Sequence, residues 1–129
     1  MIKKILLSFA LSFFSVTILL ANNSITVFYF YSDARCSTCY KLEKYTSESL
    51  KENFKTELSS GKIIFKPINI SEPNNKHYLT DYQLYTKSVI LDNGNGEWEN
   101  LDQIWQLVRN EKKFKSYIAA ETKKFMEKK

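Results

Sequence analysis

The feature that most constrains the fold is a pair of cysteines, Cys36 and Cys39, between a strand-like segment and a helix-like one. Residues 25–31 are β-branched or aromatic, so they predict a buried strand. From Cys39 onward apolar residues recur at helical spacing until a Ser-Ser-Gly stop at 59–61. These apolar positions are Leu42, Tyr45, Leu50 and Phe54. The chain therefore predicts a strand, a Cys-X-X-Cys turn and a helix that begins near Ser37.

The first 21 residues have the organisation of an export signal. Met1 to Lys4 is a short basic segment, an apolar run extends from Ile5 to Leu20, and the small residue Ala21 closes it. Cleavage after Ala21 would remove 21 of the 129 residues and leave a mature domain of 108, residues 22–129. The alternative is an uncleaved anchor, because the run approaches the roughly 17 to 25 residues that span a bilayer. Under either alternative we expect the domain in the periplasm or another extracytoplasmic compartment.

The rest of the chain has the pattern of an α/β domain. In chain order the expected elements are a strand at 62–70, a short helix ending at Tyr82, a strand at 88–91, a turn at 92–96 with a return arm at 97–99, and C-terminal helical segments at 101–108 and 114–125. These last segments are either two helices or one helix with a break near Asn110. Pro67 predicts that its strand is bulged or lacks a neighbour on the donor side. Trp98 follows the turn and Trp105 shares a helical face with apolar residues, so both are expected to be structural. No linker or repeat divides the chain, so we expect one domain with a central mixed sheet flanked by helices.

Charge and composition exclude some classes of function. The formal charge is +5, and the residues after the signal carry +3 without a concentrated basic patch. Nucleic-acid binding is therefore not expected, and the charge is interpreted as aiding solubility. Two cysteines are too few for a disulfide-stapled mini-protein, and a chain of this length can bury a core without them. We expect a monomer whose cysteines have a chemical function rather than a stabilising one.

The spacing of the cysteines predicts two roles. Cys36 would lie at the mouth of the helix, where unpaired N–H groups and the helix dipole favour a thiolate, and Arg35 would add a positive charge. We expect Cys36 to be exposed to solvent, whereas Cys39, one turn inside, would be more buried and would resolve the mixed disulfide that Cys36 forms. A structural disulfide is disfavoured because so short a loop constrains the unfolded chain weakly. A zinc site is disfavoured because His77 is the only further His or Cys, and we expect His77 at the surface.

Residues 27–54 resemble the thioredoxin superfamily, in which a central strand delivers Cys-X-X-Cys to the start of a helix. The order of elements extends this resemblance over nearly all of the mature domain and implies a thioredoxin-like fold. More narrowly, residues 28–31, 35–39, 82–88 and 100–105 are similar to a small exported bacterial family known as the nitrophenyl-compound nitroreductase subunit. Its members resemble exported thioredoxin-like proteins found with redox membrane transporters, which implies a partner of that kind. No flavin or other cofactor is expected, because nothing in the sequence suggests a flavin site.

Three positions depart from thioredoxin itself. The place of its cis-proline falls near Lys87-Ser88, its buried acid falls at Phe30, and the lysine that partners this acid falls at about Pro67. We therefore expect the docking of substrate peptides to be less well supported than in thioredoxin. We also expect the Cys39 proton to move through water or other groups. These departures favour a dedicated protein partner over general protein-disulfide reduction.

The sequence predicts an extracytoplasmic thiol-disulfide oxidoreductase that exchanges two electrons through Cys36 and Cys39 with a protein thiol or disulfide. The direction of electron flow is open, because Ser37 and Thr38 do not determine the reduction potential. The alternatives are a thiophilic metal or metalloid carrier that uses the two thiolates, and an adaptor without turnover.

Overall fold

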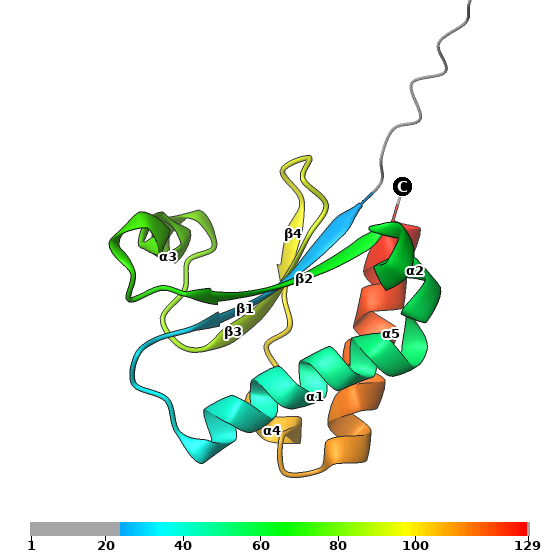
Figure 1. The fold of residues 1–129 in the computed structure, drawn as a ribbon, viewed down its shortest axis with the longest axis horizontal. Helices are drawn as coiled ribbons and strands as arrows, with labels where there is room; N and C mark the ends of the chain where they lie inside the picture. Colours follow the sequence, from blue (N-terminus) through cyan, green and yellow to red (C-terminus); the bar gives the residue numbers. More distant parts are fainter. Residues whose placement is uncertain (1–23, 129) are drawn as a thin grey trace, which may run out of the picture.

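The computed structural model describes residues 24–128, which form an α/β domain with a four-stranded mixed sheet (Figure 1). The expected signal segment at 1–21 lies outside the described residues. In chain order the elements are β1 (Ile25–Tyr31), α1 (Ser37–Asn53), α2 (Lys55–Ser60), β2 (Ile63–Asn69), η1 (Pro73–Asn75), α3 (His77–Asp81), β3 (Ser88–Asp92), β4 (Trp98–Asn100), α4 (Ile104–Leu107) and α5 (Glu111–Glu127). Within this part of the chain, no helix is long and apolar enough to cross a membrane.

The sheet has the order β2-β1-β3-β4, with β1 near its centre. Strand β2 runs parallel to β1, whereas β3 is antiparallel to both β1 and β4. Pro67 lies opposite Tyr29 in an uninterrupted register, and β2 is an edge strand. The missing N–H of the proline is thus tolerated because that side of β2 has no neighbouring strand in the described domain.

One face of the sheet carries the main core, because alternate strand residues point to it and α1 and α5 cover it (Figure 1). Val27 and Tyr29 of β1 and Phe114 of α5 are completely buried there. Lys115 of α5 also pairs across the helices with Glu48 and Glu52 of α1, at 2.8 and 3.0 Å. These contacts fix α1, and with it the cysteine motif at its start, against the central strand.

The opposite face carries a smaller aromatic cluster under η1 and α3. Phe28 and Phe30 of β1 stack with centroids 5.1 Å apart and contact Tyr78 and Tyr82. Tyr82 also donates a hydrogen bond of 2.5 Å to Asp92 of β3. Phe30, the position expected to replace a buried acid, therefore faces away from α1 and belongs to an apolar cluster of aromatic and aliphatic side chains.

One detail differs from the expected elements and another agrees with them. The first long helix ends at Asn53 rather than at the Ser-Ser-Gly stop, because Phe54 turns its ring into the core and a separate short helix, α2, follows. Gly61 then ends α2 in the left-handed conformation, with φ of 77°. The expected break near Asn110 is confirmed, since its side chain caps α5 by accepting from the Lys113 N–H at 3.0 Å.

Candidate functional site

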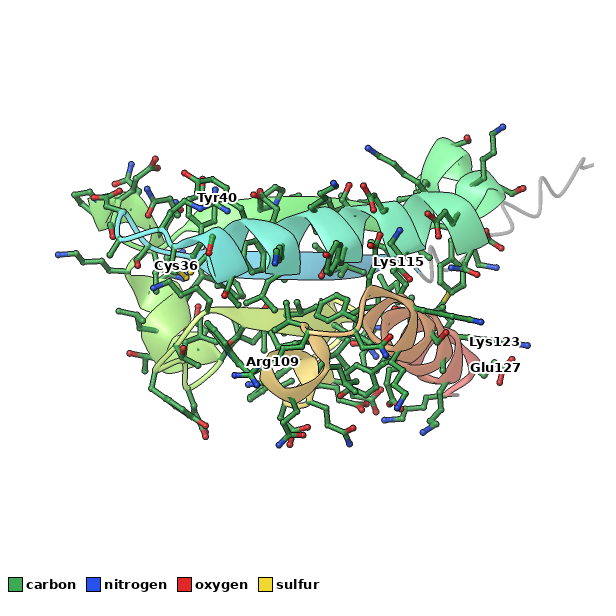
Figure 2. All side chains as sticks on the ribbon, turned by 90° about the horizontal axis from the view of Figure 1, so that it is seen from below. Cys36, Tyr40, Arg109, Lys115, Lys123 and Glu127 are labelled. Atoms are coloured by element: carbon green, nitrogen blue, oxygen red, sulfur yellow. The ribbon has the colours of Figure 1, made fainter. Side chains whose placement is uncertain are left out.

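Cys36 lies at the N-terminal end of α1 (Figure 2), which begins at Ser37 as expected, and Cys39 lies in the first turn of this helix. Cys36 is the N-cap residue in an extended conformation, with φ of −113° and ψ of 169°. Its sulfur accepts a hydrogen bond from the Cys39 backbone N–H at 3.2 Å. Cys36 is exposed, whereas only 1% of Cys39 is accessible, and neither forms a disulfide. The sulfur thus takes the capping position that a hydroxyl or carboxylate oxygen usually fills.

The surroundings lower the pKa of the Cys36 thiol. The largest causes are hydrogen bonds from the Cys39 side chain and from the Cys39 backbone, followed by a backbone N–H of Thr38 and the positive charge of Lys87. Partial removal of the Cys36 thiol from water raises its pKa, but this effect is smaller than the combined effect of the groups that lower it. These donors stabilise the anion more than the neutral thiol, which is the condition for a nucleophilic cysteine.

Arg35, expected to add a positive charge at Cys36, is engaged elsewhere and is not among the leading causes of the lowered Cys36 pKa. Its guanidinium donates to Glu43 at 2.7 Å and lies between the rings of Tyr31 and Tyr40, 4.3 and 4.2 Å from their centroids. Lys87, from the loop before β3, is the cation among these leading causes. In the sequence analysis, Lys87 was placed near the cysteines only through the comparison with the cis-proline of thioredoxin. Nothing in the sequence indicated that its charge would lower the pKa of Cys36.

Tyr29 is the polar group that β1 places closest to the buried cysteine. Its side chain is completely buried on the α1 side of the sheet, and its hydroxyl donates to the Cys39 carbonyl at 2.8 Å. Sequence reasoning treated Tyr29 only as a strand residue. The alternation of side chains along β1 could have indicated its position, because a residue next to Phe30 must face the other side of the sheet.

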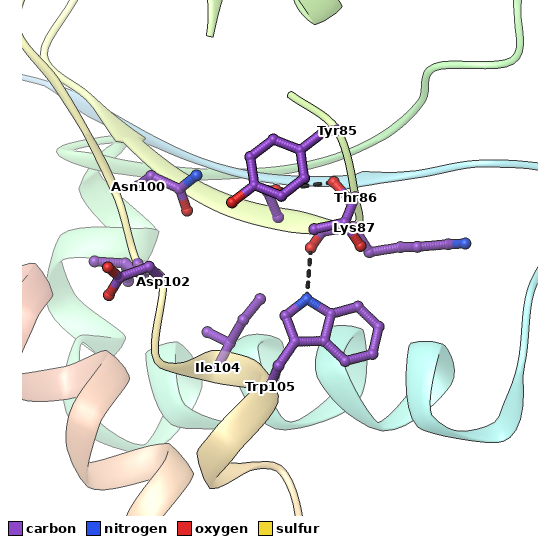
Figure 3. Close-up of a pocket in the computed structure, with 9 residues that line it drawn as sticks. Tyr85, Thr86, Lys87, Asn100, Asp102, Ile104 and Trp105 are labelled. Carbon is purple, nitrogen blue, oxygen red and sulfur yellow. Dashed lines mark hydrogen bonds between the residues drawn. The ribbon is translucent and has the colours of Figure 1, made fainter. Parts of the chain in front are cut away.

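Trp105, which was expected to be structural, lies beside the loop that carries Lys87 (Figure 3). The residue is 37% exposed, and its indole N–H donates to the Lys87 carbonyl at 3.1 Å. A small cavity of about 50 Å³ lies between this loop and α4, with Tyr85, Ser88 and Ile104 in its lining. This volume suits a few water molecules rather than an organic cofactor.

The described residues 24–128 contain no group of three or more His, Cys, Asp or Glu that could hold a metal ion. His77 is exposed on α3, on the other side of the sheet from α1, and contacts Asp81 at 2.7 Å. The N-terminal end of α1 thus holds both thiols and Lys87 contributes its charge to Cys36, while His77 is not part of the site.

Comparisons with known proteins assign no family to this chain. No family model matches, and no curated protein matches. One solved structure, described as "Structure of a malarial protein", aligns over 61% of this chain and 76% of its own length, with 16% identity and a TM-score of 0.43. A likeness at this level carries no argument about function, so function is argued from the site alone.

Proposed function

We propose that this protein is a thiol-disulfide oxidoreductase with a thioredoxin-like fold, in which Cys36 attacks and Cys39 resolves. The observation that carries the proposal is the asymmetry of the pair: Cys36 is exposed at the N-cap with a lowered thiol pKa, and Cys39 is buried one turn inside α1. A solely structural disulfide would need no such difference. The sheet order and the position of the motif between β1 and α1 support the fold assignment.

The proposed exchange moves two electrons from the protein dithiol to a partner disulfide. The Cys36 thiolate attacks one partner sulfur, a mixed disulfide forms, and the other partner sulfur leaves as a thiolate. Cys39 then loses its proton to water and attacks the Cys36 sulfur, which releases the second partner thiolate and leaves a Cys36–Cys39 disulfide. The reverse sequence oxidises a partner dithiol, and the reduction potential of the pair decides which direction operates.

We propose an extracytoplasmic compartment and a dedicated protein partner, which a redox membrane transporter would fit. The basis for the compartment is the export-like segment at 1–21. The basis for a dedicated partner is the loop before β3, where Lys87 and Ser88 stand in place of an X-Pro turn and Trp105 holds the Lys87 carbonyl. An oxidising compartment also suits thiol-disulfide chemistry.

The division of roles is tested with single cysteine variants. Cys36→Ser should abolish alkylation by iodoacetamide at mildly acidic pH and eliminate exchange with a disulfide substrate. Cys39→Ser should leave Cys36 reactive and accumulate a mixed disulfide, because nothing releases the bound partner. That adduct, isolated under denaturing conditions and analysed by mass spectrometry, would identify the partner.

The proposal fails if Cys39 is alkylated faster than Cys36 in the folded protein, or if both single variants keep full exchange activity. It also fails if the reduced protein exchanges no disulfide but binds a thiophilic metal ion such as Cu(I) stoichiometrically through both thiolates, which is the alternative function. A measured reduction potential of the Cys36–Cys39 couple then sets the direction of electron flow.

A further inference from the structure

Tyr29 is a buried polar side chain that the exchange of thiols does not itself use. It lies in the central strand β1, none of its surface is accessible, and its hydroxyl donates to the Cys39 carbonyl at 2.8 Å. In a helix, a carbonyl at this position ordinarily accepts from the N–H four residues later. The tyrosine is therefore an additional donor, and it joins the first turn of α1 to the sheet.

The Tyr29 hydroxyl stays a donor throughout the working pH range. Burial is the main cause that raises the pKa of this phenol well above its ordinary value, and proximity to Cys39 adds to the effect. The ring also stacks on Tyr31, with centroids 6.0 Å apart, and Tyr31 in turn lies against Arg35. Tyr29 is thus fixed in place by its neighbours and remains protonated.

This contact gains importance when Cys36 has reacted. In the reduced protein the Cys36 sulfur caps α1 by accepting the Cys39 N–H. In a mixed disulfide that sulfur is bonded to the partner and carries no charge, so it is a much weaker acceptor. The cap is weakened at the stage when Cys39 must reach Cys36, and the bond from Tyr29 to the Cys39 carbonyl involves neither sulfur.

We propose that Tyr29 is a positioning residue for the resolving step, because it ties Cys39 to the central strand while the partner is covalently attached to Cys36. The inference rests on the proposed thiol-disulfide exchange. It assigns Tyr29 no part in the first attack, which depends on Cys36 and its hydrogen-bond donors.

The test separates the two steps with an aromatic disulfide reagent that releases a coloured thiolate. With reduced protein in excess, attack by Cys36 releases one thiolate per reagent molecule and leaves a mixed disulfide. Attack by Cys39 on the Cys36 sulfur then releases the second and forms the Cys36–Cys39 disulfide. Tyr29→Phe should leave the first phase unchanged and slow the second by about 3-fold to 10-fold, the range that the loss of one hydrogen bond gives.

Two control variants separate positioning from general loosening. Tyr31→Phe removes a neighbouring tyrosine hydroxyl from the same strand. Ser49→Ala removes a hydrogen bond of 2.6 Å from α1 to the Lys115 carbonyl, far along the helix from the cysteines. Both controls should leave the second phase at the wild-type rate, although Ser49→Ala should lower the melting temperature.

The outcomes distinguish this inference from the proposed function. If the wild-type protein gives the first phase but never the second, the exchange mechanism itself is wrong. If the wild type gives both phases and Tyr29→Phe slows neither, only the role of Tyr29 is overturned. An equal slowing by Ser49→Ala would also overturn it, because the effect would then follow from the stability of α1.

Discussion

The two cations beside the cysteine motif are predicted to have separable effects, which Arg35→Met and Lys87→Met test. Arg35 and Glu43 are 16% and 26% exposed at their side chains, so partial screening places their interaction at the low end of the usual ranges. A charge-assisted hydrogen bond contributes about 1.5 kcal/mol there, and each of the two cation–π contacts about 0.5 kcal/mol. Arg35→Met should therefore lower the free energy of unfolding by about 2.5 kcal/mol.

Stability and thiol acidity are measured for both variants. A loss of about 2.5 kcal/mol corresponds to a melting temperature lower by about 10 °C in a domain of this size. Lys87 forms no ion pair within residues 24–128, so Lys87→Met should change the stability by less than about 0.5 kcal/mol. Unfolding is followed by circular dichroism on the reduced protein.

The pH profile of Cys36 alkylation should respond to Lys87→Met but not to Arg35→Met, which is the reverse of the expected effects on stability. Because the pKa of Cys36 is lowered in the fold, its alkylation rate should be half-maximal below the pH that an unperturbed thiol requires, about 8.5. Lys87→Met removes one favourable charge, so the midpoint should rise toward that value. Arg35→Met should leave the midpoint unchanged, since neither Arg35 nor Glu43 is a principal cause of the shift.

The sign of the linked stability follows from the same shift. A thiol that ionises more readily in the folded state stabilises the fold above its unfolded pKa, and this contribution is lost as the pH falls through the folded pKa. A midpoint raised by Arg35→Met as much as by Lys87→Met would refute the assignment of Lys87 as the acting cation. A large loss of stability in Lys87→Met would contradict the prediction that the two cations have separable effects.

Two further predictions concern the indole at α4 and the start of the chain. Trp105→Ala should cost less than the roughly 3 to 5 kcal/mol that removal of a fully buried aromatic ring costs, because Trp105 is 37% exposed. Phe114→Ala, at a completely buried site, should fall within that range; urea unfolding measures both, and equal costs would show that Trp105 is a core residue. Export predicts a mature protein that begins at Asn22, and mass spectrometry of protein from outside the cytoplasm should find that terminus, whereas a membrane-bound product with an intact Met1 would support the anchor.

Local sequence patterns were sufficient to predict several elements of the fold. Strand β1, the start of α1 at Ser37, the turn before β4 and the break near Asn110 were all predictable, because hydrophobic periodicity, glycine turns and caps are properties of short segments. The same reasoning indicated that Cys36 would be exposed and Cys39 buried, since one precedes the helix and the other lies a turn inside it.

The side chains from distant segments that surround the cysteines could be identified only from the way the domain packs. Arg35 is adjacent to Cys36 in sequence but is directed to Glu43, while Lys87, from the loop before β3, lowers the pKa of Cys36 through its charge. Tyr29 lies under Cys39 because α1 packs on one particular face of β1. Sequence proximity fixes distance along the chain, whereas charge and hydrogen bonding act through space, so these assignments depend on how the helix and the loop pack against the sheet.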